Sequence, residues 1–437
     1  MTALVLNDGQ RKALDEIIAD KRFGHIHLLT GNAGSGKTTL MEELVRWCQR
    51  NRLEVVVTAT THKAVAVLAK RFLAAGIIVN CRTIFSLLEL KPEVVSDRQV
   101  FTRSKKASPV LARVVIVDEV SMMGADLLRH VKAHLPLSYV LFVGDPAQLP
   151  PVGEEESGAF KVQNRSHLDT IVRQAEGNPL LGAARIMREQ QGKPLDMSWA
   201  KSRNVGKVGV FRPSDPKAWI KRAFTSDAFN EDPDSFRYLA WTNDRVAQVN
   251  AAIRGWRYGP TNLPLVQGER ALIRAPIIRD ETILFNTNEE TDVLGIEESE
   301  FYYPIPDCGN ADGTTCAGWN AVVPSWEVTL YHEESGEDVE VHMPRDILEF
   351  NRVIDTIKAE AMAGARARWK HLFDFKGAMA NLQSIYAMTV HTSQGSTFDN
   401  AFMDVADIQR RVSSNLLEAQ QLFYTAGTRP RHGLFLV

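Results

Sequence analysis

The octapeptide at positions 31–38 (GNAGSGKT) constrains this chain more than any other stretch. It matches the phosphate-binding pattern G-x-x-x-x-G-K-[ST], and both of its flanks have the right character. His25–Thr30 is an apolar run typical of a buried strand, and an apolar stripe at helical spacing follows the loop. A strand, this loop and a helix together let backbone N–H groups surround phosphate oxygens. The sequence therefore predicts a nucleoside triphosphate site in an α/β protein.

Each residue type in this loop has a predicted task. Lys37 supplies a point charge for the β- and γ-phosphates, and the hydroxyl of Thr38 is a ligand for Mg²⁺. The other predicted nucleotide contacts of the loop and first helical turn are Gly34, Ser35, Gly36 and Thr39. The loop thus predicts a magnesium–nucleotide complex.

Composition indicates a globular chain without a membrane partner. Its 437 residues are 44% hydrophobic, which is enough for two or more cores. There is no apolar run of membrane-spanning length and no signal-peptide layout, and the four cysteines lack metal-ligand spacing, so we expect reduced thiols and a cytoplasmic location. The formal net charge is −2, so any nucleic acid must bind in a local groove.

The distribution of apolar runs predicts the domain organisation. Continuous β-branched and aromatic runs separated by helix-period segments indicate parallel strands buried on both faces, and hence a doubly wound α/β fold. The runs concerned are Val55–Thr58, Val114–Val117, Tyr139–Val143 and Tyr238–Trp241. From about Gly255 to Ala380 the chain has short alternating stretches such as Trp326–Tyr331 and Val339–Met343. This segment predicts a mostly β insertion followed by a helical stretch near Ile347–Trp369.

Two adjacent carboxylates follow one of these strands. Phosphoryl transfer to water requires a carboxylate in the Mg²⁺ shell and a base that orients the attacking water. Asp118 is predicted to hold the metal, and Glu119 to accept the proton of the water. A solvated acidic strand end is the simpler alternative, but it does not explain a phosphate loop one α/β span earlier.

Three further residues are candidates for catalysis. Gln148, in the segment 144–152 (GDPAQLPPV), is placed to sense the γ-phosphate after another buried strand. Arg173 and Arg429 are candidate transition-state stabilisers, because a guanidinium from another domain neutralises developing charge. A single arginine is more often a surface residue, so their assignment depends on the order of the whole set.

That order resembles the motif order of superfamily 1B DNA helicases of the RecD/Dda branch, over nearly the whole chain. The matching segments are 6–10 (LNDGQ), 31–38, 58–64 (TATTHKA), 83–87 (TIFSL), 118–121 (DEVS), 144–152, Arg173, 386–397 (YAMTVHTSQGST) and 424–431 (YTAGTRPR). The resemblance implies two RecA-like motor domains with parallel sheets, ATP between them, and single-stranded DNA crossing both with 5′ to 3′ polarity. It also implies that Gln10 reads adenine and that Gly395 belongs to the nucleotide site.

The resemblance further implies domain boundaries. The first motor would comprise residues 1–87 and 114–175, interrupted by a pin insertion at 88–113. The second motor would comprise 176–255 and 381–437. An SH3-like β domain with a helical extension would occupy 256–380.

The resemblance also implies a DNA track. The expected contacts are Thr61, His62, Thr83 and Ser86 on the first motor, Thr389 and His391 on the second, Phe101 at the tip of the pin, and Trp369 in the insertion. Opening one base-pair step costs roughly 1.4 kcal/mol, and one aromatic stack contributes about 1–3 kcal/mol, so a single Phe suffices as a wedge. The alternatives are ordinary cap or turn roles for the hydroxyl residues and a core role for the tryptophan.

The sequence thus predicts a monomeric ATP-dependent DNA helicase. Expected partners are single-stranded and forked DNA, with single-strand-binding or replication proteins, in a bacterial or phage-infected cytoplasm. A nucleotide-gated clamp or loader, an RNA helicase and a P-loop nucleotide kinase are the alternatives. A clamp would not need Glu119 and two arginine fingers, and a kinase would not need Gln148 but would need an Arg-rich lid.

Overall fold

The computed structural model of the chain describes residues 6–95, 98–103, 107–169, 177–279, 282–309, 313–333 and 335–437, with backbone alone at 91–95, 98–100 and 282. Contacts divide the chain into two compact units. The first comprises 1–91, 103–259 and 386–437, and the second 92–102 and 260–385. No helix in the described ranges is long and apolar enough to cross a membrane.

The first unit begins with a six-stranded sheet, ordered β3-β2-β6-β7-β1-β8, in which every neighbouring pair is parallel. Its strands are β1 (Ile26–Gly31), β2 (Val55–Ala59), β3 (Asn80–Thr83), β6 (Val114–Asp118), β7 (Tyr139–Gly144) and β8 (Arg165–Leu168). Its helices are α1 (Asp8–Ala19), α2 (Lys37–Arg50), α3 (His62–Ala74), α4 (Ile84–Leu87) and α5 (Ala125–His134). The central strands are buried along their length, which confirms the prediction from their continuous apolar runs.

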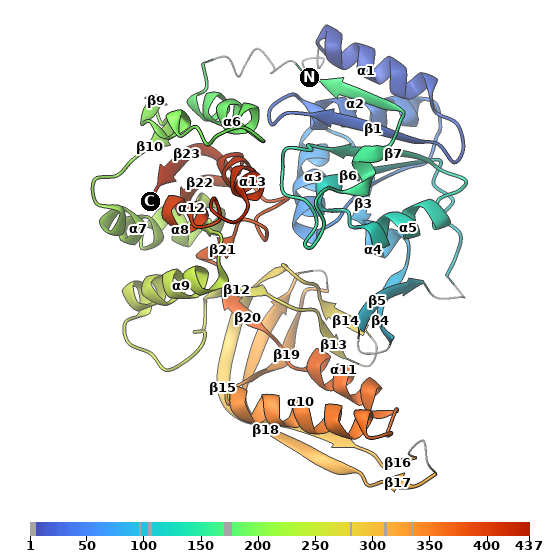
Figure 1. Cartoon of the computed structure of the whole chain (residues 1–437), viewed down its shortest axis with the longest axis vertical. Helices are drawn as coiled ribbons and strands as arrows, with labels where there is room; N and C mark the ends of the chain where they lie inside the picture. Colours follow the sequence, from blue (N-terminus) through green and yellow to red (C-terminus); the bar gives the residue numbers. More distant parts are fainter. Residues whose placement is uncertain are drawn as a thin grey trace. The chain divides into compact units, whose positions relative to one another are not determined.

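A second six-stranded sheet in the same unit has the order β21-β11-β22-β23-β10-β9. Its strands are β9 (Arg203–Val205), β10 (Val208–Phe211), β11 (Phe236–Ala240), β21 (Ala387–Thr389), β22 (Phe398–Met403) and β23 (Pro430–Leu436). Only the edge strand β9 pairs antiparallel, which makes this sheet mixed. In Figure 1 the red C-terminal strands lie beside the green β10, so the chain returns here after the insertion. Its helices are α6 (Pro179–Glu189), α7 (Pro216–Phe224), α8 (Asp227–Glu231), α9 (Asn243–Tyr258), α12 (Val405–Gln409) and α13 (Leu416–Gly427).

The second unit contains an antiparallel sheet ordered β19-β18-β15-β12-β20. Its strands are β12 (Arg270–Ile273), β15 (Glu290–Ile305), β18 (Trp319–His332), β19 (Glu337–Pro344) and β20 (Leu382–Ser384). Both strand predictions for this segment are confirmed. The predicted helical stretch is two helices, α10 (Ile347–Met362) and α11 (Arg368–Ala378), which break at Gly364 where φ is +123°. Both helices lie near the β15–β18 hairpin (Figure 1).

Three two-stranded pairs complete the described strands. They are β4 (Leu90–Val95) with β5 (Arg98–Arg103), β13 (Ile277–Arg279) with β14 (Thr282–Phe285), and β16 (Cys308–Gly309) with β17 (Thr315–Cys316). Cys308 and Cys316 lie opposite each other in the last pair, and all four cysteines are free thiols, as predicted.

Candidate nucleotide site and nucleic-acid-facing loops

The phosphate-binding loop joins β1 to α2. Gly34 and Gly36 have φ values of +77° and +83°, a left-handed conformation that glycine adopts without steric cost. The ammonium of Lys37 donates to the backbone oxygens of Gly31 at 2.7 Å and Asn32 at 3.1 Å. The amine therefore lies against the loop, where its predicted role requires it.

Two buried side-chain atoms of the loop have no hydrogen-bond partner among the described residues. They are Oγ of Ser35 and Oδ1 of Asn32. A buried polar group without a hydrogen-bond partner costs folding free energy, so such a group indicates that a ligand, water or ion supplies the partner. A phosphate oxygen would accept from Ser35, and a water on a hydrated cation would donate to Asn32. The loop therefore fits the phosphates of a nucleotide.

Two predicted nucleotide contacts are engaged by the chain itself. Gln10 is buried, and its amide nitrogen donates to the backbone oxygen of Ser35 at 3.3 Å while its amide oxygen accepts from the N–H of Asn7 at 3.0 Å. The structure thus places Gln10 as a support for the phosphate loop. The hydroxyl of Thr39 accepts from Nη2 of Arg71 at 3.1 Å.

Asp118 ends β6, and Glu119 follows it with a strained backbone. The φ of Glu119 is +53°, a region that residues with a β-carbon rarely adopt and that is frequent at functional sites. Its N–H donates to Oδ1 of Asp118 at 2.9 Å. Burial, with the neighbouring Glu119 charge, raises the pKa of Asp118 to about 7. A cation beside this carboxylate would favour its ionised form, so Asp118 fits a metal ligand.

No group of three or more His, Cys, Asp or Glu side chains that could hold a metal occurs in the described part of the chain. Mg²⁺ at nucleotide sites is usually held by one or two protein groups together with phosphates and waters. Thr38 and Asp118 are sufficient for that arrangement.

The turn after β7 is bound by residues from the other end of the chain. Asp145 is fully buried and accepts a hydrogen bond from the hydroxyl of Tyr424 at 2.5 Å. The N–H of Leu149 donates to Oγ1 of Thr425 at 3.2 Å, and its carbonyl accepts from Gln394 at 3.0 Å. Tyr424, Thr425 and Gln394 were not among the predicted site residues, although each lies within one of the matching motif segments.

Gln148 and Arg429 are both buried near this turn. Oε1 of Gln148 lacks a hydrogen-bond partner within the described residues. The Arg429 guanidinium donates to the carbonyls of Thr425 at 3.0 Å and Ser396 at 3.2 Å and to the hydroxyl of Thr428 at 2.9 Å. Burial lowers the pKa of Arg429, while the charges of Glu119 and Asp145 act in the opposite direction. A buried guanidinium whose hydrogen-bond partners are neutral oxygens keeps its charge available to bind an anion such as a phosphate. The other predicted finger, Arg173, lies outside the described residues.

Gly395, predicted to belong to the nucleotide site, lies close to the start of α3. A β-carbon on Gly395 would lie 2.9 Å from Cβ of Ala64 and 3.2 Å from Oγ1 of Thr61, at the start of α3. Its φ is +72°. The glycine therefore lies against the segment expected to touch DNA, and its predicted place at the nucleotide stays a prediction.

The hydroxyl residues predicted to touch DNA serve as caps. Thr61 accepts from the N–H of Ala64 at 3.2 Å, Thr83 from that of Ser86 at 3.1 Å, and Thr389 from that of Thr392 at 3.2 Å. Thr83 and Thr389 are buried. Their side chains therefore position the loops.

Three other expected DNA contacts lie on the same loops. Ser86 is exposed, and His62 and His391 are half-buried. Burial lowers the pKa of His391, so its imidazole is neutral at physiological pH. These side chains remain available to a strand.

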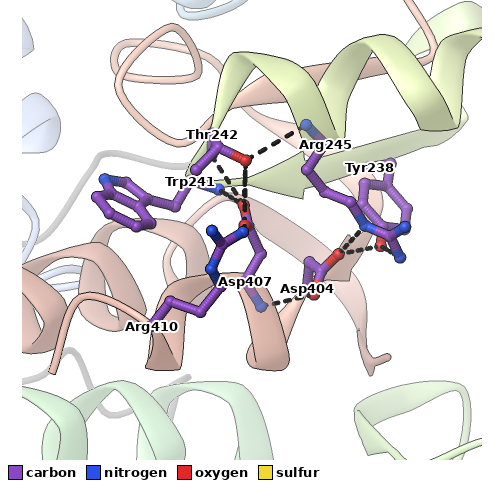
Figure 2. A network of polar contacts seen from close by, with 7 residues as sticks. All are labelled: Tyr238, Trp241, Thr242, Arg245, Asp404, Asp407 and Arg410. Carbon is purple, nitrogen blue, oxygen red and sulfur yellow. Dashed lines mark hydrogen bonds and ion pairs between the residues drawn. The ribbon is translucent and has the colours of Figure 1, made fainter. Parts of the chain in front are cut away.

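A polar network fixes the carboxyl ends of two strands in the second sheet. Figure 2 shows Asp404, directly after β22, accepting from the hydroxyl of Tyr238 and from Nε of Arg245, each at 2.6 Å. Burial together with Asp404 raises the pKa of Tyr238, so this hydroxyl remains a donor. The network holds the start of α9 against the end of β22.

Two residues of the second unit, Phe101 and Trp369, were predicted to touch DNA. Phe101 lies within the strand β5 (Arg98–Arg103) and not at its first residue, so the structure places it along the strand and not at the predicted tip; residues 96–97 lie outside the described residues. Its exposed fraction is 37%. Trp369 is half-buried against the cluster that contains Leu372 and Phe375. The indole is partly accessible, so its contact with DNA stays a prediction.

Comparison with known proteins agrees with this architecture. An AAA domain model matches residues 5–206, and a UvrD-like helicase C-terminal domain model matches residues 384–437. The chain is 25% identical to the ATP-dependent DNA helicase Dda of Enterobacteria phage T4, with 100% of both chains covered. It is 33% identical to the ATP-dependent RecD2 DNA helicase of Deinococcus radiodurans over 40% of this chain and 24% of the relative.

A structure of Pif1 helicases at forked double-stranded DNA shares the fold. Its TM-score is 0.51 at 17% identity, with 99% of this chain and 92% of the Pif1 chain covered. Motif order, fold and whole-length similarity thus confirm the predicted resemblance, and the chain is similar throughout to superfamily 1 DNA helicases of the RecD/Dda branch.

Proposed function

We propose that this protein is an ATP-dependent DNA helicase that moves 5′ to 3′ along single-stranded DNA. The observation that carries the proposal is the junction between the two sheets of the first unit. The phosphate loop, the turn after β7 and the final helix α13 meet there through Ala33, Asp145 and Tyr424. A nucleotide at this junction would contact parts of both motors. The relatives named helicases support the same activity.

In this mechanism the residues of the site have separate tasks. Lys37 and Arg429 hold the triphosphate from opposite motors, Glu119 accepts the proton of the attacking water, and Gln148 responds to the γ-phosphate. Mg²⁺, held by Thr38 and Asp118, would neutralise charge on the phosphate oxygens. Because the turn after β7 is hydrogen-bonded to Thr425 and Gln394, a change at the nucleotide is transmitted to the second motor.

The loops that follow β2, β3 and β21 are the proposed DNA track. Exposed hydroxyls and neutral imidazoles, such as those of Ser86, His62 and His391, suit a DNA strand that is repeatedly bound and released. We further propose that Phe101, on β5, separates the strands at a fork. The expected setting is a monomer acting in the cytoplasm on phage or bacterial DNA, with single-strand-binding or replication proteins.

The decisive experiment is an unwinding assay on forked duplexes that carry a single 5′ or 3′ tail. Helicase activity on the 5′-tailed substrate alone supports the proposal. Unwinding of a matched RNA duplex in preference to DNA would instead indicate an RNA helicase. ATP binding without product in a single turnover would indicate a clamp, and transfer to a small acceptor would indicate a kinase.

A further inference from the structure

Two cysteines lie opposite each other in the second unit. Cys308 on β16 and Cys316 on β17 are directly paired residues of one short antiparallel ladder. This ladder continues the long hairpin of β15 and β18, because β16 begins three residues after β15 and β17 ends three residues before β18 (Figure 1). Both side chains are half-buried, and both are free thiols. The two sulfurs are therefore paired by the fold and still accessible to a small reagent.

The spacing of directly opposite residues suits a disulfide. Such residues in an antiparallel ladder have Cα atoms about 4.5 or 5.5 Å apart, with both side chains on one face. A disulfide requires Cα atoms about 4.4–6.8 Å apart. A side-chain hydrogen bond already joins Cys308 to Cys316. The two sulfurs can thus form a covalent bond without a change in strand pairing.

A buried guanidinium lies beside one of the two sulfurs. Nη2 of Arg368, the first residue of α11, donates to Sγ of Cys316 at 3.5 Å. The Arg368 side chain is fully buried, and it also donates to the carboxylate of Glu360 at 2.6 Å and to the carbonyl of Ala317 at 2.8 Å. These contacts fix the cation beside the sulfur. A neighbouring arginine favours the thiolate, which is the form of cysteine that attacks an oxidant.

The other thiol has a different environment. Burial raises the pKa of Cys308; the charge of Arg368 opposes this shift, and the hydrogen bond with Cys316 adds to it. Cys308 therefore stays protonated at neutral pH. One sulfur beside a cation and one protonated thiol next to it provide both parts of a redox pair, because the first attacks the oxidant and the second completes the disulfide.

We propose that Cys308 and Cys316 form a redox modification site, at which hydrogen peroxide converts the two thiols into a disulfide. The Cys316 thiolate attacks one peroxide oxygen, the O–O bond breaks, and hydroxide leaves and takes up the proton that Cys316 had lost. The sulfur of Cys308 then bonds to the sulfenic acid sulfur of Cys316. The sulfenic hydroxyl leaves with the Cys308 proton as water. In total the two thiols lose two electrons and two protons, and one peroxide becomes two waters.

The disulfide would join two segments that the reduced protein holds by hydrogen bonds alone. Arg368 donates to the carbonyl of Pro306, just before β16, and to that of Ala317, just after β17. Oxidation would make this junction covalent and independent of the guanidinium. Where thiol reductants are abundant the pair stays reduced, and a disulfide forms there only transiently. The site is thus suited to a reversible response to oxidant.

A metal site is the other use of paired cysteines. A structural zinc site requires four ligands, usually Cys and His. Within the described ranges of the chain, no group of three or more His, Cys, Asp or Glu side chains could hold a metal. The observations therefore favour sulfur–sulfur chemistry.

The test uses the full-length, reduced protein and does not depend on the proposed helicase function. The protein is treated with hydrogen peroxide, its remaining thiols are blocked with N-ethylmaleimide, and the denatured chain is cut without reductant by a protease that cleaves before aspartate. Asp312 lies between the two cysteines in the sequence, so cleavage gives the fragments 307–311 and 312–337. Mass spectrometry should find these fragments joined after peroxide and separate after dithiothreitol.

Cys81 provides the internal control. It is also half-buried, on β3 of the first unit, and burial raises its pKa. We expect peroxide to consume the paired thiols at least about tenfold faster than Cys81. Fragments that remain separate after peroxide, or a Cys81 that reacts as fast as the pair, would overturn the site.

Two variants identify the attacking sulfur. In Cys308→Ser the sulfenic acid of Cys316 has no thiol to condense with, so the sulfenic acid reagent dimedone should label it. In Cys316→Ser, Cys308 should react no faster than Cys81. Dimedone labelling of Cys308 in Cys316→Ser at the rate of Cys316 in Cys308→Ser would overturn the role given to Arg368. The wild-type fragments test the disulfide even where a variant does not fold, and none of these outcomes alters the helicase proposal.

Discussion

The hydroxyl of Tyr424 donates to Oδ2 of Asp145 at 2.5 Å and accepts from the N–H of Ala33 at 3.3 Å. One phenol thus joins the phosphate loop, the turn after β7 and the helix α13. Burial and the charge of Asp145 raise the pKa of Tyr424, so the group remains a protonated donor throughout the physiological range. The arrangement makes Tyr424 a direct link between nucleotide site and second motor.

Replacing Tyr424 by Phe should uncouple ATP hydrolysis from DNA. The variant leaves Asp145 buried without this donor, which costs about 1–3 kcal/mol of stability. We expect the stimulation of ATPase by oligo(dT) to fall about tenfold, which corresponds to about 1.4 kcal/mol. Steady-state rates of ATP hydrolysis with and without oligo(dT) measure this stimulation.

Tyr238→Phe is the matched control for this prediction. Its hydroxyl also donates to a buried aspartate, Asp404, at 2.6 Å, but within the second motor alone. This variant should lower the thermal midpoint and retain DNA stimulation. An equal loss of stimulation in both variants would show that general destabilisation, and not the link, is responsible.

Lys37→Ala should separate DNA binding from hydrolysis. The ammonium is the only part of the loop expected to place a side-chain charge on the phosphates, and it does not lie on the DNA loops. We expect hydrolysis to fall at least about a hundredfold with an unchanged Kd for oligo(dT). Retained turnover in the purified variant would refute the nucleotide-site assignment.

The raised pKa of Asp118 predicts a pH dependence. Its folded-state pKa of about 7 exceeds its ordinary value of 3.8, so the nucleotide-free protein carries a proton there near pH 6 that the unfolded chain lacks. This contribution to stability is complete below about pH 4 and is lost as the pH rises through about 7. Binding of Mg²⁺ and nucleotide should displace the proton, so affinity should increase from pH 6 to pH 8.

Calorimetry of nucleotide binding in two buffers of different ionisation enthalpy measures the number of protons that are released on binding. The wild type should release up to about one proton at pH 6.5. Glu119→Gln removes the neighbouring charge and should move the release to lower pH. Asp118→Asn should abolish it, and undiminished release in that variant would assign the proton to another group.

Phe101→Ala should remove unwinding and retain translocation. Loss of one stacking interaction of about 1–3 kcal/mol is comparable with the cost of opening a base-pair step. We expect ATPase stimulation by DNA to persist while unwinding of a forked duplex falls about tenfold or more.

An exposed aromatic residue elsewhere in the second unit provides the control for Phe101. Tyr302, on β15, is 62% exposed, and Tyr302→Ala should unwind normally. Parallel loss of both activities in Phe101→Ala would remove the pin assignment.

Much of the first motor was predictable because local chemistry determines it. Val114–Val117 could only be an interior strand, and the loop at 31–38 has one known use. The antiparallel edge of the second sheet was harder to predict from the sequence. All three residues of its edge strand β9 are exposed, so no apolar run indicates a strand there. The helix break at Gly364 was also missed, because the prediction treated 347–369 as one helical stretch.

Several contacts at the site join segments far apart in sequence and could not be predicted from local patterns. The amide oxygen of Gln10 completes a local capping box with Asn7, but nothing near it in sequence indicates that its amide nitrogen donates to the carbonyl of Ser35. The same applies to Tyr424, whose partners lie hundreds of positions earlier. Spacing predicted which segments matter, and packing determined which side chain of each segment is available.

Gly395 lies close against the start of α3. With no β-carbon there, α3 approaches the backbone after β21 to a distance that even alanine would prevent. In the proposed function the loops at His62 and His391 hold one DNA strand between them. A methyl group at Gly395 would then act as a spacer that lengthens the shortest stretch of polynucleotide these loops can hold together.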